Sequence, residues 1–171
     1  MKRELFFLFL LISYFIIASA SNWGTKYKYI GLNKDKEDKL ALRANSGEEK
    51  CRYILEDLFN LSFKRSRPNF LKNPETGRNL ELDCYNPHII TAMGSNGLAF
   101  EIDGAQHYGY VPQWHGSEDG FEKQKMRDKL KEVLCIKHGV LLIRIPFSVQ
   151  DKRKYILDKL YENNLSHYLY H

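Results

Sequence analysis

Three carboxylates stand in two short apolar runs of the chain, where a strand would normally carry hydrophobic or neutral residues. Asp83 lies in the run at residues 80–85, and Glu101 and Asp103 lie in the run at residues 98–108. Side chains two residues apart on a strand share a face, so Glu101 and Asp103 are expected to point the same way. Carboxylates on one sheet face repel each other unless a cation lies between them, and hard oxygen ligands suit Mg²⁺. The pattern therefore predicts a metal-dependent phosphodiesterase whose metal ligands are Asp83, Glu101 and Asp103.

A hairpin is needed to bring these acids together. Its strands are predicted at about residues 79–86 and 97–103, and the segment between them contains the Pro, Asn and Gly residues of a turn. A helix is predicted to precede the hairpin, with Ser46 as its N-cap and an apolar stripe that ends at Phe59. Acidic residues in the first turn of this helix, among them Glu48, suit the positive end of the helix dipole.

The rest of the chain is predicted to add a helix, a strand and a final helix. The first of these runs from Phe121 to about His138, where Gly139 ends it. Its apolar side is expected to contain Phe121, Met126, Leu130, Val133 and Leu134. Residues 140–146 are almost continuously apolar, which is typical of a strand in the buried interior of a sheet. A helix at about residues 148–163 completes a mixed α/β sandwich.

The N-terminal residues are predicted to be a targeting segment. A short basic start, an apolar run at residues 5–18 and the small residues Ala18-Ser19-Ala20 are typical of a signal peptide at residues 1–20, which implies secretion or the secretory pathway. Association with a membrane is expected only if this segment stays uncleaved, and the run is short for a bilayer span of about 20 residues. Residues 21–44 are polar and lysine-rich, as in a linker or arm, and residues 45–171 are long enough for one domain.

The charge of the chain is mildly basic, with 26 Lys and Arg against 21 Asp and Glu. A basic loop is predicted to contact phosphate groups through Lys64, Arg65, Arg67, Lys72 and Arg78. A second basic series, which includes Lys125 and Lys131, either serves the same purpose or forms a solvated helix face. The three cysteines have no zinc-ligand spacing; in an oxidising compartment one pair could form a disulfide, but the sequence does not select which.

Several segments, taken in order, resemble the PD-(D/E)XK nuclease superfamily, especially the small branch akin to very-short-patch-repair endonucleases. They are residues 46–48, 80–85, 100–108, 121–128 and 141–146, within a span of about 45–150. The resemblance implies a restriction-endonuclease-like fold, a mixed sheet flanked by helices in the order α-β-β-α-β-α. It also implies an endonuclease that hydrolyses phosphodiester bonds in DNA with Mg²⁺ or Mn²⁺ as cofactor.

The resemblance assigns Asp83 and Glu101 as metal ligands and brings Glu48 in from the first helix. The lysine that the superfamily carries two residues after the Glu is replaced here by Asp103. Either Asp103 is a further metal ligand, or a basic residue comes from elsewhere, such as Lys125 or Lys131. Gln106 and His107, just downstream, could also take part. The predicted catalytic residues are therefore Glu48, Asp83, Glu101, Asp103 and Gln106.

Other residues near the predicted site leave alternatives open. Gln124 and Asp128 share a helix face and could line the site or pair at the surface. Aromatic residues after the second strand, Tyr108, Tyr110 and Trp114, could stack on bases. Two other functions compete with a nuclease: a nucleic-acid-binding module of the same fold without catalysis, and a secreted interaction protein that uses the fold as a scaffold.

Overall fold

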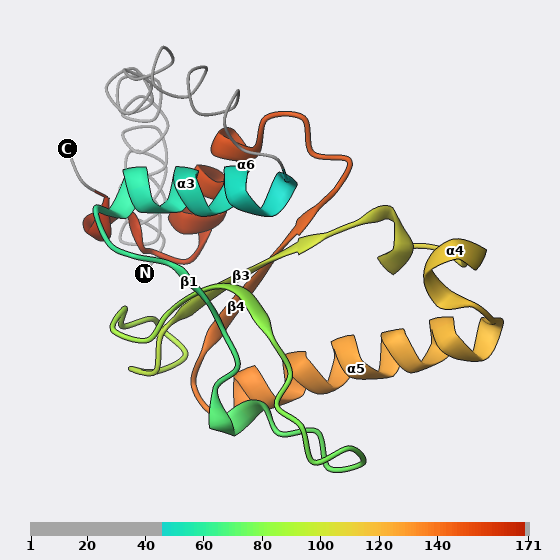
Figure 1. Ribbon diagram of the computed structural model, residues 1–171. Helices are drawn as coiled ribbons and strands as arrows, with labels where there is room; N and C mark the ends of the chain where they lie inside the picture. The colour runs from blue at the N-terminus through green and yellow to red at the C-terminus, as the bar shows by residue number, and fades with distance from the viewer. Residues whose placement is uncertain (1–45, 170–171) are drawn as a thin grey trace, which may run out of the picture. The chain divides into compact units, whose positions relative to one another are not determined.

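The computed structural model describes residues 46–169, which form a four-stranded mixed sheet with helices on both faces (Figure 1). The strands lie in the order β1-β2-β3-β4, with bounds Lys64–Ser66, Leu82–Asn86, Leu98–Asp103 and Leu141–Pro146. The β1/β2 and β2/β3 pairs are antiparallel, and β3/β4 is parallel. The predicted mixed α/β class is confirmed. The predicted signal peptide at 1–20 and arm at 21–44 lie outside the described residues.

Helix α3 (Gly47–Phe59) has the predicted start and buried side. The Ser46 hydroxyl accepts a hydrogen bond from the Glu49 N–H at 3.2 Å, which satisfies one of the first free amides of the helix. One stripe of α3 is buried against the sheet and α6, and consists of Cys51, Ile54, Leu55, Leu58 and Phe59. The N-cap and the apolar stripe predicted from the sequence are therefore confirmed.

The predicted hairpin is present as β2 and β3, in the register Cys84 opposite Phe100. The short strand β1 lies within the predicted basic loop and was not predicted as a strand. Its three residues, Lys64–Ser66, are polar and largely exposed, so they carry no hydrophobic alternation that would indicate a strand. This segment is extended because it pairs with β2, not because of its own sequence pattern.

Helix α5 (Glu118–Lys137) begins before the predicted residue Phe121, because Ser117 is its N-cap and accepts from the Gly120 N–H at 3.2 Å. Gly139, with φ of +66°, ends it as predicted. Met126 and Val133 were predicted on the apolar side of this helix, and that side is not the one that packs inward, because their exposed fractions are 66% and 49%. The reason is that the inward stripe of α5 is partly polar, formed by Gln124, Asp128, Lys131 and Cys135.

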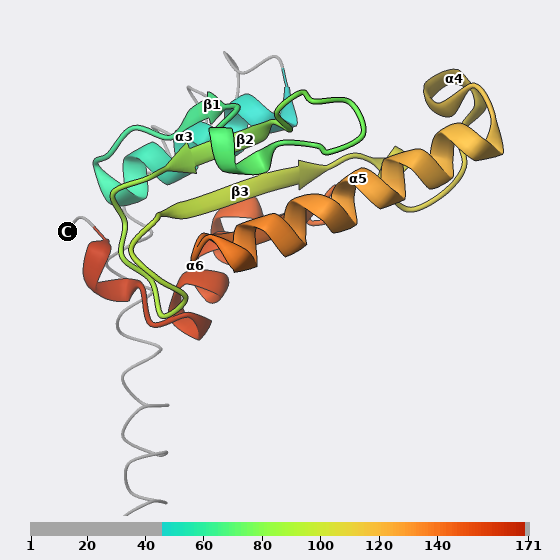
Figure 2. The same ribbon diagram turned by 90° about the horizontal axis from the view of Figure 1, so that it is seen from below.

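Strand β4 was predicted in the interior of a sheet, but among residues 46–169 it lies at the sheet edge. Its apolar character has another cause. Helix α5 packs on one face of β4 and helix α6 (Lys152–Glu162) on the other, so both faces are covered (Figures 1 and 2). Helix α6 begins after the N-cap Asp151, later than the predicted residue 148.

Four short helices complete the described chain: η1 Asn69–Leu71, η2 Ala105–His107, α4 Pro112–His115 and η3 Ser166–Tyr168. Figures 1 and 2 both show α4 at the start of α5, away from the sheet. Between residues 46 and 169, no helix combines the length and the apolar character needed to cross a bilayer. The three cysteines are buried and unbridged.

The parallel pairing of β3 and β4 determines where polar side chains can gather. The register places Asp103 beside Pro146, so both strands end at the same edge of the sheet. Glu101 lies beside Arg144 in the same register, and side chains of neighbouring parallel residues share a face. That face is the one covered by α5, and it carries the candidate site.

Candidate functional site

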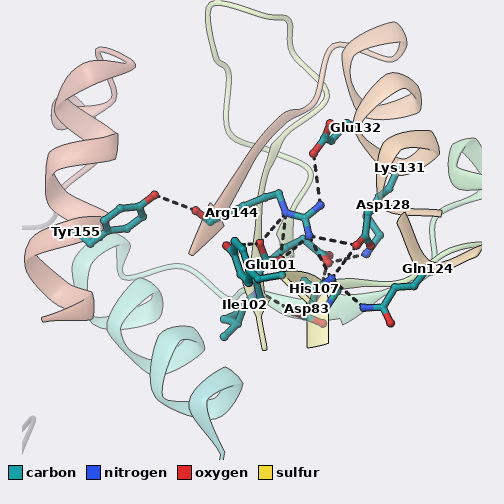
Figure 3. Close-up of polar contacts among 12 residues, drawn as sticks. Asp83, Glu101, Ile102, His107, Gln124, Asp128, Lys131, Glu132, Arg144 and Tyr155 are labelled. Atoms are coloured by element: carbon teal, nitrogen blue, oxygen red, sulfur yellow. Dashed lines mark hydrogen bonds and ion pairs between the residues drawn. The ribbon is translucent and has the colours of Figure 1, made fainter. Parts of the chain in front are cut away.

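Asp83 and Glu101 lie where β2 and β3 stop pairing through their backbones. Beyond the pair formed by Cys84 and Phe100, side chains replace the backbone acceptors. The Asp83 N–H donates to Glu101 Oε1 at 3.2 Å, and the Ile102 N–H donates to Asp83 Oδ2 at 3.0 Å. Each carboxylate is thus held by a backbone amide at the separating strand ends, as Figure 3 shows. The two acids predicted from different strands come together.

Burial makes the charged forms of both acids costly. It raises the pKa of Glu101 to about 7; Lys131 opposes this shift, and the negative charge of Asp83 adds to it. Burial is also the main cause that raises the pKa of Asp83 above its usual range. The structure therefore holds two nearby carboxylates whose shared negative charge is only partly compensated.

Lys131 supplies the close positive charge at this site. Its Nζ donates to Glu101 Oε2 at 2.5 Å, and both side chains are largely buried. The other α5 lysine that was predicted to reach the site, Lys125, is exposed and donates to Glu122 at 2.9 Å. Of the two lysines predicted from α5, only Lys131 reaches the carboxylates.

Asp103 is bound by Arg144, a residue that the sequence analysis did not select. Arg144 Nη2 lies 2.6 Å from Asp103 Oδ1, and Nε lies 2.9 Å from Oδ2. The Tyr108 hydroxyl also donates to Asp103 Oδ2 at 3.0 Å. Although burial opposes it, the bond to Asp103 raises the pKa of Arg144. The predicted metal ligand Asp103 thus serves as the counter-ion of Arg144.

A chain of polar contacts links the loop after β3 to α5. His107 Nδ1 lies 2.7 Å from Asp128 Oδ2, and this hydrogen bond raises the pKa of His107. The His115 ring accepts the Val111 N–H at Nδ1, so its Nε2 donates to Gln124 Oε1 at 3.1 Å. The amide of Gln124 then faces His107. Gln124 and Asp128, one turn apart, therefore lie inward beside His107 rather than pair at the surface, and Asp128 accepts the hydrogen bond from its ring.

An open cleft of about 730 Å³ surrounds these groups. All five predicted catalytic residues line it: Glu48, Asp83, Glu101, Asp103 and Gln106. His107 and Asp128 line it as well. The cleft therefore brings together residues from α3, both hairpin strands, the following loop and α5.

The predicted phosphate-contacting residues divide into two groups. Arg67, Arg78 and Lys131 line the cleft, whereas Lys64, Arg65, Lys72 and Lys125 do not. Arg65 instead holds Glu48, which also forms an ion pair with Arg52. Two further cations line the cleft: Arg127 on α5, which belongs to the second basic series, and Lys152 on α6, which was not predicted. Their position depends on how the helices pack, and no local sequence signal distinguishes them from other surface cations.

The raised pKa of Glu101 predicts a pH dependence of stability. Its pKa is about 7 in the folded chain against an ordinary 4.5, so between these pH values the folded state binds the proton more tightly. The free energy of unfolding should therefore fall as pH rises from 4.5 to 7, by an amount of the order of 2 kcal/mol from this group. Urea unfolding at several pH values, compared between the wild type and Glu101→Gln, measures it. Parallel pH profiles for the two proteins would contradict the shift.

Comparison with known proteins finds relatives in viruses. Uncharacterized protein 033L of Invertebrate iridescent virus 3 is 41% identical over 61% of this chain, and the match spans half of its own length. Uncharacterized protein 307L of Invertebrate iridescent virus 6 is 32% identical, over 90% of this chain and 86% of the relative. Uncharacterized protein 094L of Frog virus 3 is 37% identical, over 66% of this chain and 68% of the relative.

No family model and no solved structure matches the chain. The names of these relatives state no activity, so the chemistry of the site has to be argued from its own residues. The extent of the matches does establish kinship. The chain belongs to the family of viral proteins that includes 307L of Invertebrate iridescent virus 6 and 094L of Frog virus 3.

Proposed function

We propose that this protein is a metal-dependent endonuclease that hydrolyses phosphodiester bonds in DNA, with the restriction-endonuclease-like fold of the PD-(D/E)XK superfamily. One observation carries the proposal: Asp83 and Glu101 meet at the separating ends of β2 and β3, with Lys131 against Glu101. The arrangement of acids and lysine supports the resemblance on which the fold and the choice of DNA rest.

A divalent cation fits this pair of acids. Their oxygens are hard ligands, and burial, which raises the pKa of both groups, disfavours their negative charge unless a cation lies beside them. Within residues 46–169, there is no group of three or more His, Cys, Asp and Glu side chains that could hold a metal ion. Asp83 and Glu101 would hold the ion, and the DNA and water would complete its ligands. An Mg²⁺ or Mn²⁺ ion held by these two carboxylates would polarise the phosphate and lower the pKa of a water.

Lys131 replaces the lysine that the resembled superfamily carries on the strand. Its ammonium group is held beside Glu101, where it can stabilise negative charge that develops on the phosphate oxygens. The strand position itself is occupied by Asp103, which Arg144 neutralises. A lysine on α5 thus compensates for the acid on β3.

His107 is placed to handle a proton. Asp128 binds its Nδ1, which fixes the ring and leaves Nε2 as the nitrogen available to a bound substrate. Because the Asp128 contact raises the pKa of His107, the ring is more readily protonated near neutral pH. A protonated His107 can donate to the departing oxygen of the cleaved strand.

The cations at the cleft carry the affinity for the DNA backbone. Arg78 and Arg127 are exposed, and neither has an ion pair with another described residue, so both are available to phosphates. Contacts of this kind position the nucleic acid without selecting a sequence. In the same proposal the N-terminal signal peptide would direct the enzyme into the secretory pathway.

The direct test is cleavage by the purified full chain. Supercoiled plasmid and circular single-stranded DNA are incubated with Mg²⁺, Mn²⁺ or EDTA, and the products are separated on gels. Cleavage with either metal and none with EDTA is expected. Absence of cleavage with both metals would contradict the nuclease. Binding that weakens steeply with salt, without cleavage, would instead identify a nucleic-acid-binding module of this fold.

A lysine exchange on α5 tests the role of Lys131. Lys131→Met should lower the cleavage rate about 100-fold, because it removes a charge that stabilises the transition state. Lys125→Met is the matched control, since it removes the same charge from an exposed position on the same helix. Single-turnover rates at saturating metal measure both. Equal rates for the two variants would remove Lys131 from the mechanism.

A further inference from the structure

Two aromatic side chains meet beside the cleft at the ends of neighbouring strands. Tyr108 follows β3, and Phe147 comes directly after β4. Their ring centroids lie 5.7 Å apart with an interplanar angle of 54°. Both are exposed, with exposed fractions of 56% for Tyr108 and 51% for Phe147. A pair of large rings held together but open to solvent has apolar area available to a partner.

The pair is fixed next to the reactive groups. The Tyr108 hydroxyl donates to Asp103 Oδ2, and Asp103 lies two residues beyond Glu101 on β3. Phe147 lines the same cleft as Asp83 and Glu101. A group stacked on these rings would therefore belong to a substrate that also reaches the carboxylates.

The surroundings indicate what that group is. Arg127 and Lys152 line the same cleft as Phe147, so cations suited to phosphates share this cleft with an aromatic ring. An unpaired nucleotide has both parts, an anionic phosphate and a flat base. In a duplex the bases are stacked on one another, and freeing one costs a few kcal/mol. A cleft of about 730 Å³ falls within the range of pockets that enclose small molecules, so a single nucleotide can enter it.

We infer that Tyr108 and Phe147 form a stacking platform for an unpaired base, so that the preferred substrate is DNA with a single-stranded segment at the cleft. This inference rests on the proposed function, because it names the substrate class of the same site. It assigns a binding role to Phe147 and Tyr108 and leaves catalysis to the carboxylates and Lys131.

Binding in EDTA tests the platform without any need for cleavage. The probes are a fluorescent single-stranded oligo(dT) of about 12 nucleotides, an abasic strand with the same phosphates, and a fully paired blunt-ended duplex. Phe147→Leu keeps the apolar volume and removes the ring. Ile136→Ala is the control, because Ile136 is an apolar side chain on α5 that is 62% exposed and does not line the cleft. Fluorescence anisotropy gives each Kd, and thermal unfolding verifies that the variants fold.

Phe147→Leu should weaken binding of oligo(dT) about 10-fold and leave binding of the duplex unchanged, since only unpaired bases can stack on the ring. The wild type should prefer oligo(dT) to the abasic strand, and Phe147→Leu should lose that preference. If Phe147→Leu binds oligo(dT) with the affinity of the wild type, the stacking platform is overturned. If that binding still weakens steeply with salt, the proposed function stands without the platform. No binding of any probe by the wild type would overturn both.

Discussion

Glu101→Gln is expected to reduce metal-dependent DNA cleavage by at least about 1,000-fold while the chain remains folded. Glutamine preserves the shape of the side chain and an oxygen that can accept the Asp83 N–H. It removes the negative charge that would hold the cation, and it removes the acceptor that binds the Lys131 ammonium most strongly. Both the metal and Lys131 would therefore lose their position in one substitution.

The same substitution should act on metal binding in the absence of DNA. Titration of Mn²⁺ by calorimetry is expected to give heat for the wild type and none for Glu101→Gln, and Asp83→Asn should behave alike. Glu122→Gln is the matched control, because Glu122 is an exposed acid on α5 that pairs with Lys125. Cleavage by Glu101→Gln at the rate of Glu122→Gln would show that the acids on β2 and β3 are not the site.

The parts of the site that were predictable lie on one hairpin. An acid at an inward-facing position of an apolar strand would have a buried charge, which is unfavourable. Such a position can be recognised in the sequence without any tertiary structure. Asp83 and Glu101 were found in this way, and the structure brings them into direct contact through the Asp83 N–H. The first helix was predictable for the same reason, because its N-cap Ser46 and its apolar stripe are close together in the sequence.

The remaining groups depend on how distant elements pack. Lys125 and Lys131 were equivalent candidates in sequence, and only the docking of α5 on the sheet separates them. Phe147 and Lys152 join the cleft because β4 and α6 lie beside it. Arg144 did leave a signal that was not used: it is the sole charged residue in the apolar run at 140–146. A charge in a buried strand requires a partner, and Asp103 is that partner.

Arg144 is expected to be the most important single cation for stability. Arg144→Met should lower the free energy of unfolding by about 3–5 kcal/mol, because it leaves the buried carboxylate of Asp103 without its counter-ion. The substitution also removes ion pairs to α5, because Arg144 Nη2 lies 3.5 Å from Asp128 Oδ2 and Arg144 Nη1 lies 3.4 Å from Glu132 Oε1. Arg127→Met, an exposed arginine with no ion pair among the described residues, should change the unfolding free energy little.

A double substitution separates the lost ion pair from lost packing. If the unpaired carboxylate is the main cost, Asp103→Asn in the background of Arg144→Met should recover part of the stability, whereas Asp103→Asn alone should destabilise the wild type. Urea unfolding at pH 7 gives the four free energies. Additive effects would mean that the two side chains do not depend on each other. Strong coupling would mean that Asp103 holds Arg144 in place, and through it the strand ends and α5 that frame the cleft.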